Sequence, residues 1–178
     1  MRKPACMFSN DSKHLAYALG DGTVKSGAIA DPKLEALSVD VHKGATLSLV
    51  AHPAGGFLSG GDDGKVARIA TDGAVTEIAR AKGKWIEHLA ANTASNIIAW
   101  SEGKDALVLA AKATAPKRLP HASTIGGLAF DPKGKRLAAA IYNGVSLWWA
   151  NADEPKANFL EWKGSHIGVS IQPGGDYH

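Results

Sequence analysis

The stretch AHPAGGFLSGGDDGKVARIATDGAVTEIA, residues 51–79, contains two Asp-Gly pairs, Asp63-Gly64 and Asp72-Gly73, each between short runs of strand-like composition. A phosphate-binding loop would need a helix directly after it and a lysine in the Walker spacing, and GGDDGKV (60–66) has neither. A calcium loop needs six or more oxygen ligands, more than this loop offers. An Asp-Gly pair between two strands is typical of a β-hairpin. We therefore expect residues 60–66 to turn the chain between two strands.

Related strand-to-turn segments recur along the whole chain. They begin at Phe8, Ala51, Ala90, Phe130 and Ile171, at spacings of 43, 39, 40 and 41 residues. The glycines of their closing turns, Gly22, Gly64, Gly103 and Gly144, repeat this period independently, at spacings of 42, 39 and 41. A fixed period between about 20 and 50 residues indicates a repeat architecture. The spacing therefore predicts four repeats and the beginning of a fifth.

Each repeat has room for four short strands. In the second repeat we expect strands over 46–50, 57–60, 65–70 and 74–79, because Pro, Gly, Asn or Asp bounds each run and no segment of helical period interrupts them. A single four-stranded sheet of about 40 residues cannot bury its faces alone, so neighbouring sheets must stack. Radial stacking of twisted sheets gives a β-propeller. The sequence thus predicts an all-β fold, a β-propeller of four-stranded antiparallel blades.

Two of the repeats, the second and the fourth, resemble units of the WD-repeat family. The fourth repeat has His121, then GLAFDPKGKRLAAA (127–140), then YNGVSLWW (142–149). The second has His42, Ser59, Asp63 and Gly64, but Ile69 where the tryptophan would fall. The third departs most, with KGKW (82–85) and EGKD (102–105) at these places, and no repeat keeps an intact Trp-Asp pair. The stretches GKWIEHLA, YNGVSLWW and EWKGSHIGV are similar to uncharacterised bacterial WD-repeat proteins.

The resemblance implies a structural role for six residues. It makes Asp63, in the turn, the hydrogen-bond partner of His42, with Ser59 nearby. A buried carboxylate that lacked such donors would cost about 1–3 kcal/mol. In the fourth repeat His121, Asn143 and Trp148 are expected at the structural hydrogen-bond positions. We expect none of the six to be catalytic or to bind a metal or cofactor.

The sequence contains few signs of catalytic or metal-binding chemistry. None of the seven histidines has His-x-His, His-x-x-His or Glu-x-x-His spacing, and His42, His121 and His166 recur at one repeat position, which favours a scaffold role. Gly-x-Ser-x-Gly is absent, and Cys6 is a lone thiol near the N-terminus. We therefore expect no enzyme activity, although propeller enzymes exist and a site can be assembled from several blade loops without a linear motif.

Composition narrows the cellular setting. The 178 residues are 45% apolar and carry a net charge of +3, with no dense Lys or Arg run, so nucleic-acid binding is not favoured despite a pI near 9.0. A single cysteine excludes an intrachain disulfide and fits a reducing compartment. No secretory h-region and no membrane span can be read from the sequence. We expect a cytoplasmic protein that does not bind membranes.

Two functions of different classes follow from this fold. The first is a non-enzymatic scaffold that binds a protein or peptide through its loops and rim. The alternative is a small-ligand or metal-handling propeller with a polar central channel. Arg68 breaks the apolar pattern of its strand, since the corresponding residue of the fourth repeat is Leu147. We expect Arg68 to reach the channel side and pair with an acidic group; the alternative is a local register shift that exposes it.

The repeat boundaries predict an incomplete ring. We expect one propeller domain over 1–178, with blades at 1–41, 42–81, 82–120 and 121–164 and a partial blade at 165–178. GSHIGVSIQPGG restates a repeat opening, with His166, Pro173 and Gly175 in the positions of His121, Pro132 and Gly134. The resemblance implies seven blades, so this chain would be an open fragment of a longer protein. Open blade faces would favour self-association.

Overall fold

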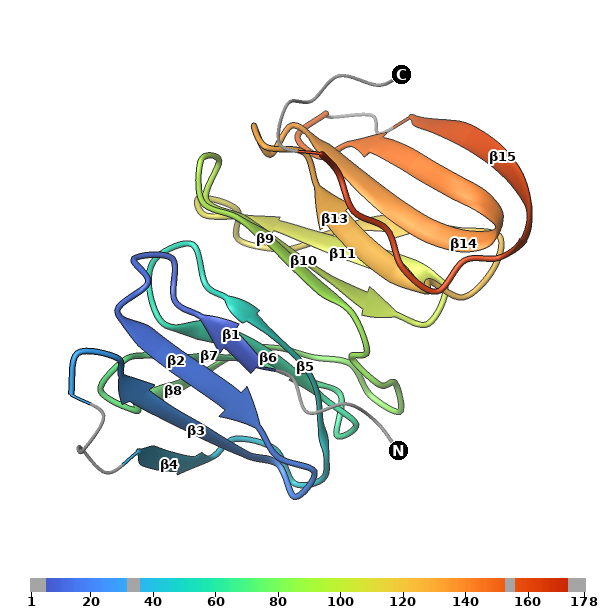
Figure 1. Ribbon diagram of the computed structural model, residues 1–178. Coiled ribbons are helices and arrows are strands. Elements are labelled where there is room, and N and C mark those ends of the chain that lie inside the picture. Colours follow the sequence, from blue (N-terminus) through green and yellow to red (C-terminus); the bar gives the residue numbers. More distant parts are fainter. Residues whose placement is uncertain (1–5, 32–35, 153–155, 173–178) are drawn as a thin grey trace. The chain divides into compact units, whose positions relative to one another are not determined.

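The computed structural model describes residues 6–31, 36–152 and 156–172 (Figure 1). Strands, turns and bends make up these three ranges, and no helix is assigned within them. The chain divides between Leu89 and Ala90 into two compact units. Each unit holds two antiparallel sheets, and the units are described separately below.

The first unit contains two four-stranded sheets whose strands follow sequence order. One sheet consists of β1 (Cys6–Phe8), β2 (His14–Ala18), β3 (Thr23–Ala28) and β4 (Leu37–Asp40). The other consists of β5 (Thr46–Ala51), β6 (Phe57–Gly61), β7 (Lys65–Ile69) and β8 (Val75–Arg80). All four strands of this second sheet lie within one residue of the ranges expected from the sequence. Short runs between turn-forming residues therefore locate the strands well.

The loop in GGDDGKV is the hairpin turn between β6 and β7. Gly64 has φ +76°, a left-handed conformation that glycine adopts without a Cβ penalty. The Asp63 carboxylate accepts a hydrogen bond from the Lys65 backbone N–H at 3.1 Å, which is the Asx geometry of a tight turn. The Asp72 carboxylate does the same for Ala74 N–H, at 3.0 Å, between β7 and β8. Both Asp-Gly pairs therefore form turns.

The core of the first unit draws on both of its sheets. Ala16, Ala18 and Val24 from β2 and β3 pack with Leu49, Phe57, Ala67 and Ile69 from β5, β6 and β7, all at most 4% exposed. Neither sheet could form this core alone. Stacking of neighbouring sheets, which the repeat length requires, thus provides the apolar burial.

The second unit has a sheet of four strands and a sheet with three assigned strands. The first is β9 (Leu89–Asn92), β10 (Ile97–Glu102), β11 (Asp105–Ala110) and β12 (Lys117–Pro120). The second is β13 (Gly127–Phe130), β14 (Arg136–Trp149) and β15 (Ala157–Ser165). A core of apolar side chains from both sheets includes Ile97, Leu119, Leu137 and Trp148.

The long element β14 is a hairpin. Asn143 and Gly144, at its middle, have φ values of +66° and +154°, and Ala150 N–H donates to Lys135 O at 2.9 Å across its two ends. Its first half pairs with β13 and its second half with β15. The fourth repeat therefore has the four-stranded antiparallel layout of the other three, with two strands assigned as one element.

The beginning of a fifth blade was expected at 165–178. Ser165 is the last residue of β15, and residues 166–172 form no strand. They lie against the start of β13: a Cβ on Gly126 would be 2.1 Å from His166 O, and one on Gly127 would be 2.8 Å from Gly168 Cα. Pro173 and Gly175 lie outside the described residues. An open arc of a seven-bladed ring stays a prediction.

Candidate functional site

The second repeat brings His42, Ser59 and Asp63 into one hydrogen-bonded cluster. His42 Nδ1 lies 2.9 Å from Asp63 Oδ1, and His42 Nε2 lies 3.0 Å from Ser59 Oγ. Asp63 also accepts from the backbone N–H groups of Lys43, at 3.2 Å, and Lys65. The cluster connects the segment before β5 to β6 and to the β6–β7 turn, so it holds three parts of the repeat together.

Burial and hydrogen bonding together set the charges of this cluster. Desolvation lowers the pKa of His42, and it outweighs the hydrogen bond and charge of Asp63, which act in the opposite direction. Burial alone would raise the pKa of Asp63, but the hydrogen bonds from His42, Lys65 and Lys43 outweigh it, and the pKa is lowered. A neutral His42 therefore donates a hydrogen bond from Nδ1–H to an ionised Asp63 and accepts a hydrogen bond from the Ser59 hydroxyl at Nε2.

A Ser-His-Asp chain of hydrogen bonds is also the arrangement of an activated nucleophile. Ser59 is 0% exposed, however, and the His42 side chain is 0% exposed as well. A nucleophile must reach its substrate, and no substrate atom can contact Ser59 Oγ here. The cluster is arranged to hold the blade together.

The fourth repeat arranges the corresponding residues differently. Trp148 donates its indole N–H to His121 Nε2 at 2.9 Å. His121 Nδ1 is buried and has no hydrogen-bond partner among the described residues. The Asn143 side chain forms its hydrogen bond elsewhere and not with His121. Asn143 Oδ1 accepts a hydrogen bond from the Gly164 backbone N–H of β15 at 3.2 Å. Burial lowers the pKa of His121, so the ring is neutral at pH 7.

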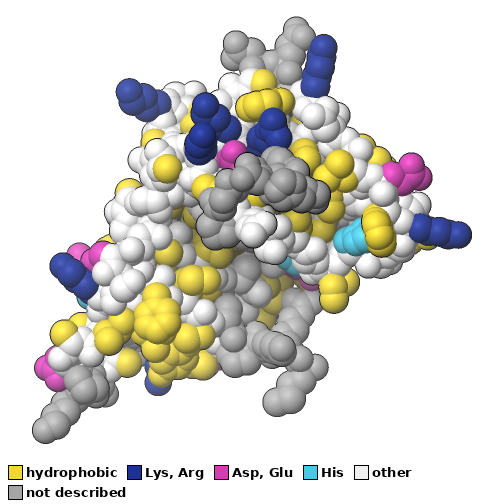
Figure 2. Space-filling view, turned by 45° about the horizontal axis from the view of Figure 1, so that its top comes forward, with side chains coloured by type: hydrophobic (Ala, Val, Ile, Leu, Met, Phe, Trp, Pro, Cys, Tyr) yellow, Lys and Arg dark blue, Asp and Glu magenta, His cyan; other side chains and the backbone are white. Residues whose placement is uncertain are grey.

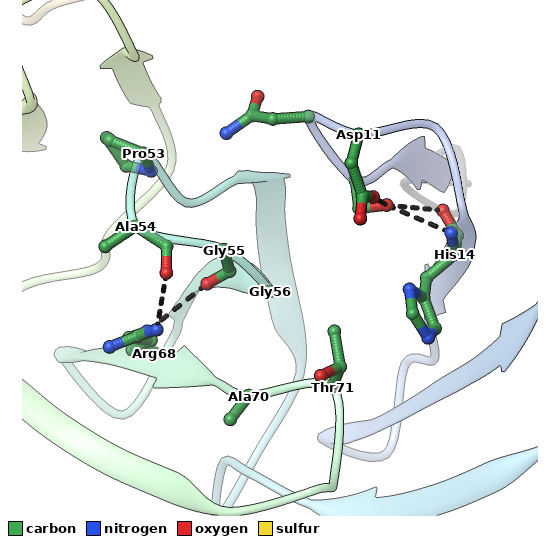
Figure 3. A pocket seen from close by; sticks show the side chains of 11 residues that line it. Asp11, His14, Pro53, Ala54, Gly55, Gly56, Arg68, Ala70 and Thr71 are labelled. Atoms are coloured by element: carbon green, nitrogen blue, oxygen red, sulfur yellow. Dashed lines mark hydrogen bonds between the residues drawn. The ribbon is translucent and has the colours of Figure 1, made fainter.

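Arg68 lies in a pocket of the first unit that is formed by turns of its two sheets (Figure 3). The pocket has a volume of about 410 Å³, and its walls are the β1–β2, β5–β6 and β7–β8 turns. Arg68 Nη2 donates to Ala54 O at 2.8 Å, and Nε donates to Gly55 O at 3.3 Å. Figure 3 shows the guanidinium lying across this turn, with Asp11 and His14 on the opposite side.

The expectation that Arg68 pairs with an acidic group is therefore wrong. Two backbone carbonyls accept the hydrogen bonds of its guanidinium. The pairing of β7 with β8 has a register shift between Val66 and Ala67, next to Arg68. The Arg68 side chain is half-buried. Asp11, the nearby carboxylate of the pocket, is already bonded to Ser9 Oγ at 2.6 Å and to Lys13 N–H. Both carbonyls belong to the β5–β6 turn, in which Gly55 has φ +88°.

The outermost strand of the second unit exposes large apolar side chains. On β15, Phe159 is 49% exposed, Leu160 54% and Trp162 74%. Tyr142 and Trp149 of the neighbouring strand β14 are also exposed. Figure 2 shows one face of the molecule, with hydrophobic side chains exposed in several places and lysines and arginines among them. These apolar residues were not singled out by sequence reasoning, because exposure depends on what covers the strand.

The described residues contain neither a metal-binding cluster nor a helix that could span a membrane. Within residues 6–31, 36–152 and 156–172, no group of three or more His, Cys, Asp or Glu side chains is arranged to hold a metal ion. In the same ranges, no helix has the length and apolar character required to cross a membrane.

These observations define the class of protein. The chain has the all-β fold of WD-repeat β-propeller blades, built from four-stranded antiparallel units. The expected fold class is confirmed.

Comparison with known proteins supports the resemblance at two levels. A chain in the crystal structure of the Mitotic Checkpoint Complex superposes with a TM-score of 0.79 over 96% of this chain and 58% of that chain, at 13% identity, which shows the fold alone. The ribosome biogenesis protein erb1 of two Aspergillus fumigatus strains is 40% identical over 73 residues, which are 40% of this chain and 8% of erb1. No protein-family profile matches the chain. The chain thus spans 58% of the solved chain, and the match to erb1 spans far less of that protein.

Proposed function

We propose that the chain is a non-enzymatic protein-interaction scaffold that binds a protein partner through the edge strand β15, which exposes apolar side chains on both of its faces. The observation that carries this proposal is the exposure of Phe159, Leu160 and Trp162 on one edge strand. Aromatic side chains dominate binding energies at protein interfaces, because they bury large apolar areas with few rotatable bonds. Because about half or more of each side chain is exposed to water, burial of these residues contributes less to folding than burial of a core residue does.

The other outermost strands lack such a surface. β8 exposes one large apolar residue, Val75 at 37%, and β4 exposes Leu37 at 39%. On β12 the apolar Leu119 is fully buried. The concentration of exposed aromatic side chains on β15 is therefore particular to one blade and does not follow from the repeat.

The comparisons give general support to a role in assemblies. The similar solved chain was crystallised in a complex of proteins, and erb1 is described as a ribosome biogenesis protein. Neither name specifies a partner for this chain.

The test is affinity capture of the chain from its native cells with a matched pair of double variants. Phe159→Ser with Trp162→Ser removes the apolar anchors of β15, and Leu37→Ser with Val75→Ser removes exposed apolar residues elsewhere. We expect one set of partners to be lost with the β15 variant and kept with the control. Capture of the same proteins by both variants, or of none by the wild-type chain, would overturn the proposal.

A further inference from the structure

A groove of about 570 Å³ lies on the face of β14 and β15 that is turned toward the end of β12. The antiparallel register pairs Ser146 with Phe159, Trp148 with Ala157, and Gly144 with Glu161. Residues paired across two strands point to the same face, so Trp148, Phe159 and Glu161 lie on one side of the sheet. The volume of the groove is in the range of about 300–1,000 Å³ that is usual for ligand pockets.

Aromatic rings form much of the wall of this groove. Trp148 is only 8% exposed, and its indole N–H is already bonded to His121, so it presents a fixed apolar surface. Phe159 is 49% exposed and Tyr142 57% exposed, so both rings can be covered by a ligand. Aromatic faces carry negative partial charge and attract cations.

The described side chains that line the groove carry negative charge and no positive charge. Among the described side chains of the groove, Glu161 alone is charged at neutral pH, because His121 is neutral there. Glu161 is exposed, and no ion pair or hydrogen bond of its side chain is formed with a described residue. An anion would be repelled by Glu161, and a purely apolar chain that covered it would leave a desolvated carboxylate without a partner.

We propose that this groove binds the guanidinium of an arginine side chain that a protein partner presents. A guanidinium is planar and stacks on aromatic rings, and its donors match a carboxylate and neighbouring oxygen acceptors. The groove offers both: the ring of Phe159 beside that of Trp148, and the exposed carboxylate of Glu161. This inference rests on the proposed scaffold function, and it specifies the chemistry of the partner.

The test is an NMR titration of the full chain, labelled with ¹⁵N, with three blocked peptides. The peptides are acetyl-Gly-Arg-Gly-amide, its citrulline analogue, which is a neutral isostere, and its lysine analogue. The Trp148 indole signal is assigned by its loss in Trp148→Phe. We expect the arginine peptide to shift this signal and to bind about tenfold tighter than the citrulline peptide. We expect the lysine peptide to be weaker than the arginine peptide.

Variants connect the binding to the groove. Glu161→Gln should weaken the arginine peptide by about tenfold, whereas Glu77→Gln, on the exposed outermost strand β8, should leave its binding unchanged. Equal binding of the arginine and citrulline peptides, tighter binding of lysine, no shift at Trp148, or wild-type binding by Glu161→Gln would each overturn the inference. The scaffold proposal would survive such a result if Phe159→Ser with Trp162→Ser still loses native partners. It would fail separately if capture finds none.

Discussion

Trp148 donates its indole N–H to His121 Nε2 at 2.9 Å, and the two rings meet edge to face with their centroids 5.5 Å apart. Because Nε2 accepts this bond, a neutral His121 carries its proton on Nδ1, the atom that has no partner among the described residues. His42, at the same repeat position, has partners for both ring nitrogens. The histidine of the fourth repeat is therefore held by one side-chain hydrogen bond and that of the second repeat by two.

Trp148→Phe should lower the free energy of unfolding by about 2–4 kcal/mol, because it removes the indole N–H that donates to the half-buried His121 and leaves a cavity in the core. Trp162→Phe is the matched control, since Trp162 is 74% exposed. Urea denaturation followed by far-UV circular dichroism measures both variants. Similar losses for the two variants would show that the His121–Trp148 pair does not stabilise the blade.

Asp63→Asn should destabilise the chain by about 1–3 kcal/mol. An amide has one acceptor oxygen, so His42 Nδ1–H, Lys43 N–H and Lys65 N–H can no longer all be satisfied at this side chain. Asp62→Asn is the control, because it makes the same chemical change one residue earlier in the turn. Urea midpoints for the two variants test the difference, and an Asp62→Asn loss as large as that of Asp63→Asn would contradict it.

The repeat period made the fold predictable, because turn residues such as Gly64 and Gly144 mark the ends of strands whatever packs on them. The approach of His42, Ser59 and Asp63 could be anticipated from the resemblance to WD-repeat units, which implies that these residues are hydrogen-bond partners. The partners of Arg68 could not, because they are backbone carbonyls, and no sequence pattern says which way a carbonyl points. Alternation along ANFLEWKGS could have placed Phe159 and Glu161 on one face. It could not have shown that Trp148 of β14 lies on the same face as these two residues.

Gly64→Ala should destabilise the chain more than Gly83→Ala does. Both glycines have a left-handed backbone, with φ +76° and +67°, so each alanine costs about 1–2 kcal/mol of strain. A Cβ on Gly64 would also lie 2.1 Å from Ala81 O, whereas a Cβ on Gly83 would meet nothing within 4 Å. Thermal unfolding of the two variants isolates this steric cost. Equal melting temperatures would mean that the β6–β7 turn can move away from Ala81 freely.

Four partly buried histidines make stability depend on pH. Desolvation lowers the pKa of His42, His52, His88 and His121, and for His52 the value is about 4, to which the charge of Arg68 also contributes. In the unfolded chain these rings titrate near pH 6.5, so below that pH the unfolded state binds more protons than the folded state. The free energy of unfolding should therefore be fully retained above pH 6.5 and fall as the pH is lowered toward 4.

His52→Asn tests the contribution of one ring to this loss. His52 Nδ1 accepts a hydrogen bond from Ala54 N–H at 3.1 Å, and protonation of that nitrogen would remove the acceptor. An asparagine oxygen can accept from the same N–H in an Asx turn but does not titrate. Urea midpoints at pH 7.5 and 4.5 should therefore differ less in His52→Asn than in the wild-type chain, and NMR should show the His52 ring titrating near pH 4. An unchanged difference between the two pH values, or a His52 midpoint near 6.5, would contradict this account, because the ring would then bind its proton equally well in the folded and unfolded chain.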